Sequence, residues 1–251
     1  MNLKKCAVSL TVVFSALSCT SIQKQALPPV SELPKPNSDV VELDHTYFQI
    51  QYSKTHRLPV LVQYTVSKAD LKGSGKRRDN FHEDKKLAAL EIEPVGPEDY
   101  PGKLFDRGHM APAADFNRSQ EAMDATFVMS NMVPQKASLN RIAWSRLEAK
   151  VRTWICGEEK LTIFTGPVLN DKLPRLEEEI SIPERFFKVV FDETPPLKSI
   201  AFIYSQSDKG NPILDRRSTV DEVEKESGLK IQKEKTKYPL VKELEAWKSC
   251  S

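Results

Sequence analysis

The chain has 251 residues, with 37 lysines and arginines against 35 aspartates and glutamates, and its formal net charge is +2. That length allows one or two domains with a sizeable core, and 39% hydrophobic with 29% charged residues exclude a disordered or collagen-like chain. Four cysteines are too few for a disulfide-framed scaffold, and the near-zero charge excludes a globally basic nucleic-acid binder.

Residues 1–19 have the pattern of an export signal. Two lysines precede a mostly apolar run, residues 7–17, that is too short to span a bilayer. Cys19 stands where a bacterial lipoprotein signal is cleaved and lipidated, although Ala16 occupies the usual leucine position. We therefore expect export from a bacterial cell, as a secreted, periplasmic or lipid-anchored protein. A buried N-terminal helix is the alternative.

Residues 20–39 are polar, contain four prolines and predict an extended tether before a single domain at 40–251. Removing the signal leaves 35 basic and 35 acidic side chains, so the mature chain is formally neutral. Cys156 and Cys250 then remain in the domain, and export permits either a disulfide or two free thiols.

Strands and helices are interspersed along the domain. Alternation and β-branched or aromatic residues predict strands at 47–52, 58–66, 163–165, 186–191 and 200–204. Apolar residues recurring every four positions predict a helix at 140–155, and a shorter helix is expected at 220–228. Without regular βαβ alternation, this order indicates an α+β fold around a mostly antiparallel sheet.

The segment Asp106–Arg107–Gly108–His109 is the first candidate for chemistry. It places an acid, a cation, a flexible glycine and an imidazole side by side, and histidine is the side chain best suited to move protons near neutral pH. Alone, the four residues could equally form a salt-bridged turn.

The sequence that follows favours a catalytic role for this segment over a salt-bridged turn. D-R-G-H-x-A-P is followed by S-N-x-x-P-Q at 130–135, L-N at 139–140 and A-W-x-x-L-E at 143–148. This pattern resembles the family of non-specific DNA/RNA endonucleases, in order and in spacing, over nearly the whole domain. The resemblance implies a ββα-metal finger, two strands and a helix, with DNA and RNA as substrates.

The resemblance also implies roles. His109 matches the general base that activates water, Asn140 the direct protein ligand of a catalytic Mg²⁺ (with Mn²⁺ as a substitute), and Glu148 the carboxylate that holds the metal's water shell. Magnesium ions keep several waters and need few protein oxygens. On a regular helix, Asn140 and Glu148 would lie roughly 12 Å apart along the axis and about 80° apart around it, so Glu148 would act through water.

Arginines and one acid complete the predicted site. Arg78 is our choice for the arginine that stabilises the phosphate, and its neighbour Arg77 is the close alternative or a substrate-binding residue. Arg107 is expected to assist at the phosphate and Asp106 to orient its neighbours. Arg141 and Arg146 are expected to bind the substrate.

The charge is unevenly distributed. Residues 136–153 hold five cations against one acid, and residues 72–86 hold six against three. We therefore expect a basic cleft on a neutral protein, with little sequence preference because phosphate contacts carry none.

Two other classes stay open: a catalytically silent surface lipoprotein that binds nucleic acid or a partner, and a phosphodiesterase for small esters, which a deep closed pocket would favour. A homodimer is also left open. A zinc site is disfavoured because closely spaced cysteine and histidine pairs are missing from the sequence. His45, His56 and His82 are expected at the surface or in hydrogen bonds.

Overall fold

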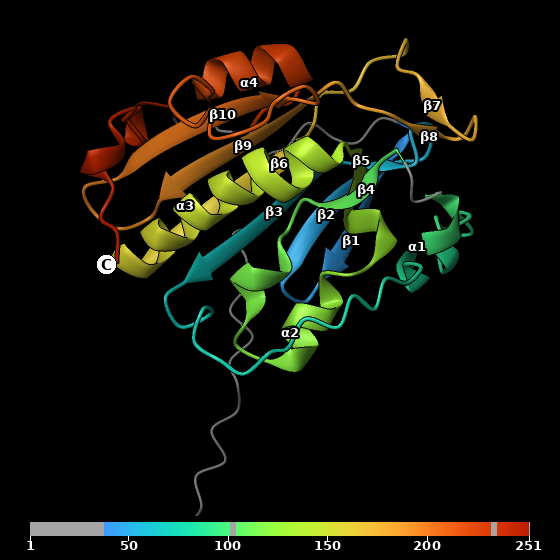
Figure 1. Cartoon of the computed structure of the whole chain (residues 1–251), viewed down its shortest axis with the longest axis horizontal. Coiled ribbons are helices and arrows are strands. Elements are labelled where there is room, and N and C mark those ends of the chain that lie inside the picture. The colour runs from blue at the N-terminus through green and yellow to red at the C-terminus, as the bar shows by residue number, and fades with distance from the viewer. Residues whose placement is uncertain (1–37, 101–103, 232–234, 251) are drawn as a thin grey trace, which may run out of the picture.

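A long antiparallel sheet organises the domain (Figure 1). The computed structural model describes residues 38–100, 104–231 and 235–250, so the predicted signal and residues 20–37 of the tether lie outside the described residues. Asp39, assigned to the tether, is already bonded to the sheet because its side chain accepts a hydrogen bond from the hydroxyl of Ser53 on β2.

Within the described residues, seven strands form one sheet in the order β1-β2-β3-β6-β9-β10-β11, and every neighbouring pair is antiparallel. The strands are β1 Val40–His45, β2 Phe48–Ser53, β3 Leu58–Ser67, β6 Lys160–Pro167, β9 Arg185–Asp192, β10 Lys198–Ser205 and β11 Arg217–Ser218. Two small antiparallel pairs stand apart: β4 Asp106–His109 with β5 Met132–Gln135, and β7 Arg175–Leu176 with β8 Ile180–Ser181.

Both faces of the sheet are covered, so its strands carry apolar residues on both sides. In β9, Phe186 and Val190 pack into one core with α3 (Ser145–Gly157), which lies across the sheet in Figure 1. Phe187 and Val189 pack into a second core that contains residues of α4 (Val220–Ser227). Alternate side chains of a strand point to opposite faces, which places the two helices on opposite sides of the sheet.

Short helices complete the domain. The remaining α-helices are α1 Lys85–Ala88 and α2 Gln120–Ala125, and 3₁₀ turns lie at Pro97–Asp99, Ala113–Phe116, Met129–Asn131, Lys235–Lys237 and Leu244–Ala246. In the described part of the chain, no helix has the length and apolar character needed to cross a membrane.

The five strands and two helices expected from the sequence are present, and the fold is α+β with an antiparallel sheet as predicted. Helix α4 ends where expected, at Gly228, whose φ of +73° suits glycine. Strand β1, the short strands β7, β8 and β11, and helices α1 and α2 were not predicted, because each is short or weakly patterned.

The predicted helix at 140–155 needs one correction. It runs from Leu139 to Gly157, but its first stretch, Leu139–Trp144, is a π-helix and only α3 is regular. Apolar residues recur every four positions here, slightly more than the 3.6 residues of an α-turn. A π turn takes an extra residue and so keeps the recurring residues on the buried face; these are Leu139, Ala143, Leu147, Val151 and Ile155.

Cys156 and Cys250 form a disulfide, with 5.5 Å between their Cα atoms. The bridge ties the C-terminal segment to the last turn of α3, where the N–H of Cys250 also donates to the carbonyl of Thr153 over 3.1 Å. Of the two states that the sequence left open, the structure thus has the bridged one.

Reduction of this disulfide is expected to lower the free energy of unfolding by about 2–4 kcal/mol, because it closes a long loop of 94 residues in sequence. In a protein of this size that corresponds to a melting temperature lower by roughly 5–15 °C. Thermal unfolding with and without reductant, beside Cys250→Ser, measures it. The expectation fails if reductant shifts the wild type no more than it shifts the Cys250→Ser variant.

Candidate active site

The D-R-G-H segment is strand β4, and it pairs with β5 so that Gly108 faces Val133 and His109 faces Met132. The π-helical stretch and α3 follow β5, which gives the predicted order of two strands and a helix with His109 on the first strand. Gly108 has an ordinary φ and lies close to the side chain of Gln135, which would have to move if a larger residue replaced the glycine. A Cβ there would lie 2.2 Å from the side-chain oxygen of Gln135.

His109 is held between two aromatic rings. Its ring centroid lies 5.7 Å from that of Phe81 and 4.9 Å from that of Phe127. Burial in this apolar setting, reinforced by the charge of Arg77, lowers the pKa of His109 to about 3, so the imidazole is neutral at pH 7. Its Nε2 is buried and has no hydrogen-bond partner, which leaves a nitrogen lone pair or N–H for a substrate group or a water.

The amide of Asn140 is oriented by Asp106. Its Nδ2 donates to the Asp106 carboxylate over 2.9 Å, and a carboxylate only accepts, which fixes the identity of the amide nitrogen. Arg141 holds the same carboxylate with two hydrogen bonds of 2.8 and 2.6 Å. Asp106 therefore holds both side chains in place and keeps the Oδ1 of Asn140, the atom that would bind a cation, turned away from the Asp106 carboxylate.

Glu148 lies on α3, and the π-helical stretch changes its relation to Asn140. With one extra residue in the turn, a separation of eight residues acts as about seven, and the angle between the two side chains falls from about 80° to about 20°. They thus point to nearly the same side of the helix. Burial raises the pKa of Glu148 to about 7, against the lowering effects of nearby Lys188, Arg152 and Arg77.

The two arginines of the loop before β4 differ in their surroundings. Arg77 lies over the ring of Phe127 at 5.1 Å, and its charge acts on both His109 and Glu148. Arg78 makes only a long ion pair of 3.7 Å with Asp124. Arg77 therefore has the stronger connection to the site.

We expect Arg77→Ala to reduce the cleavage rate at least ten times more than Arg78→Ala. The reason is that a fixed cation near the reacting phosphate stabilises its developing charge, whereas a distant one only adds to binding. Initial rates on plasmid at low and high substrate concentration separate the two effects. Equal losses, or a larger loss for Arg78→Ala, would restore Arg78 as the phosphate residue.

Arg107 and the helix arginines take different places. Arg107 donates to the carbonyl of Pro97 over 2.6 Å and lies over the Phe81 ring at 5.1 Å, so it braces one ring beside His109. Arg141 is engaged with Asp106, and Arg146 is exposed on α3. Only Arg146, of these three, is presented to solvent without a carboxylate partner.

A buried charge cluster lies behind Glu148 and was not predicted. Asp115 accepts hydrogen bonds from Tyr64 at 3.1 Å and Arg152 at 3.2 Å, and burial raises the pKa of Asp115. Lys188 of β9 is also buried here. Two signals were available: Arg152 follows Glu148 by four residues, the spacing of a helical ion pair, and Lys188 interrupts an otherwise apolar strand.

Two side chains brace the loop before the helix. The side chain of Asn131 bonds the backbone N–H and carbonyl of Ala111. The side chain of Gln206 accepts from the N–H of Lys136 at 2.8 Å and donates to the carbonyl of Pro134 at 2.7 Å. Gln135, by contrast, has no hydrogen-bond partner on either polar side-chain atom.

The donor set suits a hard cation held mostly by water. Among the described residues, no cluster of three or more His, Cys, Asp or Glu side chains could enclose a metal ion. One amide oxygen on Asn140, with a carboxylate on Glu148 facing the same side, fits Mg²⁺, which binds through few protein oxygens. The remaining histidines are hydrogen-bonded: His45 to Asp84, His56 to Ser181 and His82 to the carbonyl of Asn80.

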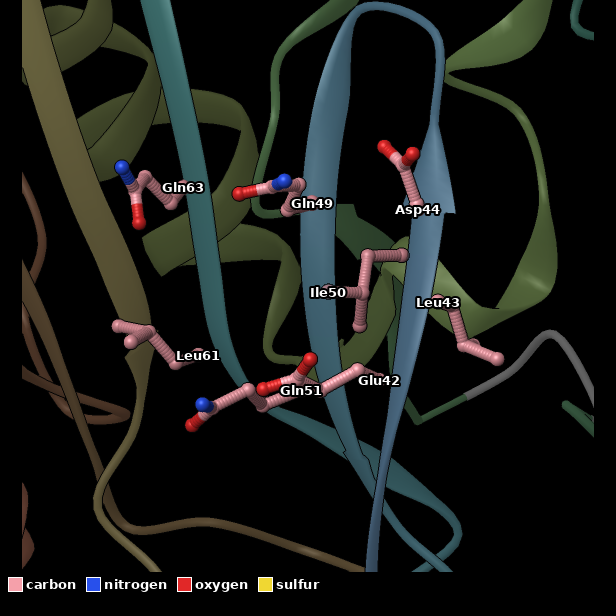
Figure 2. Close-up of a pocket in the computed structure, with 8 residues that line it drawn as sticks. All are labelled: Glu42, Leu43, Asp44, Gln49, Ile50, Gln51, Leu61 and Gln63. Atoms are coloured by element: carbon pink, nitrogen blue, oxygen red, sulfur yellow. The ribbon is translucent and has the colours of Figure 1, made fainter. Parts of the chain in front are cut away.

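Two surface pockets lie elsewhere. Figure 2 shows one on β1, β2 and β3, lined by Glu42, Leu43, Asp44, Gln49, Ile50, Gln51, Leu61 and Gln63. The other is lined by Tyr52, Lys54, Arg57, Ile92 and Glu93. Neither contains a predicted site residue, so neither supports a closed pocket for a small ester.

A ββα unit on an antiparallel sheet, with a neutral histidine on the strand and an oriented asparagine on the helix, defines the class of ββα-metal nucleases. The sequence pattern of the DNA/RNA non-specific endonuclease family matches residues 30–237, and the chain belongs to that family.

Named relatives agree with this assignment. The chain is 30% identical to mitochondrial endonuclease G of Bos taurus over 83% of its own length and 71% of the relative's. It is 33% identical to a nuclease of Serratia marcescens over 78% and 76% of the two chains. A solved structure of an EndoG/EndoGI complex contains a similar fold, with a TM-score of 0.72 and 24% identity over 79% of this chain and 89% of that one.

Proposed function

We propose that the protein is an exported, Mg²⁺-dependent endonuclease that hydrolyses phosphodiester bonds of both DNA and RNA. The observation that carries the proposal is the neutral imidazole of His109, whose buried Nε2 has no partner inside the protein. A neutral histidine with a free ring nitrogen is the form that a general base requires.

Each residue has a defined part in this reaction. His109 takes a proton from the attacking water, and proton transfer of this kind typically accelerates a reaction about 10²–10⁴-fold. Asn140 presents its amide oxygen, held in place by Asp106. Glu148 orients waters on the same side, and Arg77 offsets charge on the phosphate. A bound Mg²⁺ would supply polarisation of the phosphate and stabilisation of the leaving oxygen.

The proposed site residues do not recognise the sequence of bases. The charged and amide groups of the site address phosphate and water, and contacts to phosphate carry no sequence information. Acceptance of both DNA and RNA, with little sequence preference, follows. The basic stretches at 72–86 and 136–153 would hold the backbone, and binding through them weakens as salt rises.

Incubation of the purified protein with plasmid and with single-stranded RNA, in Mg²⁺ or in EDTA, tests the proposal. We expect cleavage of both in Mg²⁺, none in EDTA, and slower cleavage above 0.3 M salt. Asn140→Ala should need much more Mg²⁺, whereas Asn211→Ala, which replaces an exposed asparagine on the loop between β10 and β11, should not. If the wild type with Mg²⁺ leaves both substrates intact, the proposed nuclease activity is wrong. If it cleaves DNA alone, the proposed activity on RNA is wrong.

Export is supported by the pattern of residues 1–19 and by the Cys156–Cys250 bridge, since disulfides persist in oxidising compartments. Fractionation of the producing cell and the mass of the mature N-terminus test it. A chain that begins at a lipidated Cys19 supports the membrane anchor, and one cleaved there without lipid supports secretion. An unprocessed chain in the cytoplasm contradicts export.

A further inference from the structure

Two polar atoms of the D-R-G-H segment are buried without a hydrogen-bond partner. They are Nε2 of His109 and Nε of Arg107. The two residues stand two positions apart on β4, so their side chains leave the same face of the strand. A buried polar group without a partner costs free energy, and one that persists in a folded protein needs an explanation.

The ring of Phe81 lies against both side chains. Its centroid is 5.7 Å from the centroid of the His109 ring and 5.1 Å from the guanidinium carbon of Arg107. The ring gives the guanidinium a cation–π contact, but it supplies no ordinary hydrogen-bond partner to either nitrogen. A general base must come within hydrogen-bond reach of its water, so this closed arrangement has to open before His109 acts.

Phe81 is the wall of the enclosure that is free to move. Phe127, the other ring beside His109, is fully buried, whereas Phe81 is only partly buried. Phe81 also belongs to residues 74–84, which form neither helix nor strand apart from a single bridge at His82. Displacement of Phe81 therefore breaks little regular structure, as in the loops that close over other active sites.

The loop is fastened on both sides of Phe81 but not at Phe81. On one side, the side chain of Gln120 exchanges two hydrogen bonds of 2.9 Å with the backbone of Lys76. On the other side, the bridge at His82 follows directly. Within the described part of the chain, no backbone–backbone hydrogen bond joins residues 77–81 to another segment. The ring can thus swing out between two fixed points.

We propose that Phe81 is the gate of the nuclease site: its ring closes over His109 and Arg107 in the free protein, and a phosphodiester draws Arg107 away from the ring and so uncovers the imidazole. Charge-assisted hydrogen bonds from arginine to phosphate are the stronger contact, which gives the substrate the means to open the gate. The inference rests on the proposed function, in which His109 acts on a water.

A stacking platform is the competing role for an aromatic ring beside bound nucleic acid. The two roles predict opposite changes in affinity. If Phe81 stacks on a base, its removal weakens binding. If Phe81 is a gate, its removal strengthens binding, because a closed population no longer lowers the apparent affinity.

Tyr47 provides a matched control. It is also a partly buried aromatic residue under an arginine, with the guanidinium carbon of Arg118 4.7 Å from its ring centroid. Arg118 is paired with Asp70 over 2.9 Å, and these residues belong to no part of the candidate site. Tyr47→Ala therefore removes a similar ring and a similar cation–π contact without uncovering His109.

Labelling with diethyl pyrocarbonate, which acylates accessible neutral imidazoles, measures how far the gate is open, and mass spectrometry reports each histidine separately. In the metal-free wild type we expect His109 to react at least tenfold more slowly than the exposed His82. Phe81→Ala should accelerate the reaction of His109 at least tenfold, and Tyr47→Ala should leave it within twofold. A wild-type His109 that reacts as fast as His82 overturns the proposal, and so does an unchanged rate in Phe81→Ala.

Binding of a fluorescent DNA duplex in EDTA, followed by anisotropy, separates the gate from the stacking platform without any cleavage. We expect Phe81→Ala to lower the Kd at least threefold and Tyr47→Ala to leave it unchanged. A higher Kd for Phe81→Ala contradicts the gate. Should alanine unfold the domain, Phe81→Leu takes its place, with the same direction expected in both measurements.

Neither measurement depends on catalysis. If the wild type cleaves nothing in Mg²⁺, the proposed function fails, while the labelling rates still decide whether Phe81 covers His109.

Discussion

His109→Ala is expected to reduce plasmid cleavage by about 10²–10⁴-fold, the usual contribution of a general base. The residual rate comes from the groups that remain around the phosphate, Arg77 and Asn140 among them. The loss should fall on kcat rather than on KM, because the imidazole acts on the attacking water and contributes little to holding the substrate.

The effect of His109→Ala on stability must be separated from its effect on catalysis. His109 packs between Phe81 and Phe127, so alanine leaves a small cavity and a modest loss of stability, which thermal unfolding measures. His56→Ala is the matched control, because that ring is bonded to Ser181 away from the site. If His109→Ala stays folded and keeps more than a tenth of the wild-type rate, another group is the base.

Glu148→Gln is expected to change activity and stability in opposite directions. Cleavage should fall sharply, since an amide is a poor substitute for a carboxylate that orders waters around a cation. Stability should rise at alkaline pH. The pKa of Glu148 is raised to about 7 from an ordinary 4.5, and each pKa unit is worth about 1.4 kcal/mol, so ionisation costs the native state about 3 kcal/mol.

Because the pKa of Glu148 is raised, its effect on stability changes over a defined pH interval. Between pH 4.5 and 7 the native state holds a proton on Glu148 that the unfolded chain has released, so this group makes wild-type stability fall as pH rises through that interval. Glutamine cannot titrate. The two proteins should therefore be equally stable near pH 4, and the variant should gain up to about 3 kcal/mol at pH 8.

Urea unfolding at pH 4, 6 and 8 measures this difference. Glu159→Gln, an exposed glutamate just after α3, is the control and should show no pH-dependent gain. A Glu148→Gln variant that is less stable than wild type at pH 8 would mean that the lost attraction to Lys188 outweighs the relief of burial.

The sequence predicted the family and the order of two strands and a helix. The linear motif also selected His109, Asn140 and Glu148 as candidate site residues, whose roles stay predictions. Alternation and periodicity predicted the long strands and α3. The surroundings of the site depend on tertiary contacts. The order of residues does not show that Phe81 and Phe127 flank His109. It also does not show that the charge of Arg77, rather than that of Arg78, acts on His109.

Two further features were hidden for physical reasons. The π-helical stretch at Leu139–Trp144 is stabilised by packing, whereas periodicity assumes a regular turn, so the angle between Asn140 and Glu148 was misjudged. Lys188 interrupts an apolar strand in the sequence, but its burial becomes evident only when β9 is placed inside a sheet covered on both faces.

The bridge between Cys156 and Cys250 should make the stability of the protein depend on the redox state of its compartment. A nuclease without sequence preference endangers the chromosome of the cell that makes it. Under the export that we propose, both cysteines would be thiols in the reducing cytoplasm beforehand, and the C-terminal segment would not yet be tied to the end of α3. The enzyme would then be at its least stable beside its maker's own DNA, and would reach full stability only after leaving it.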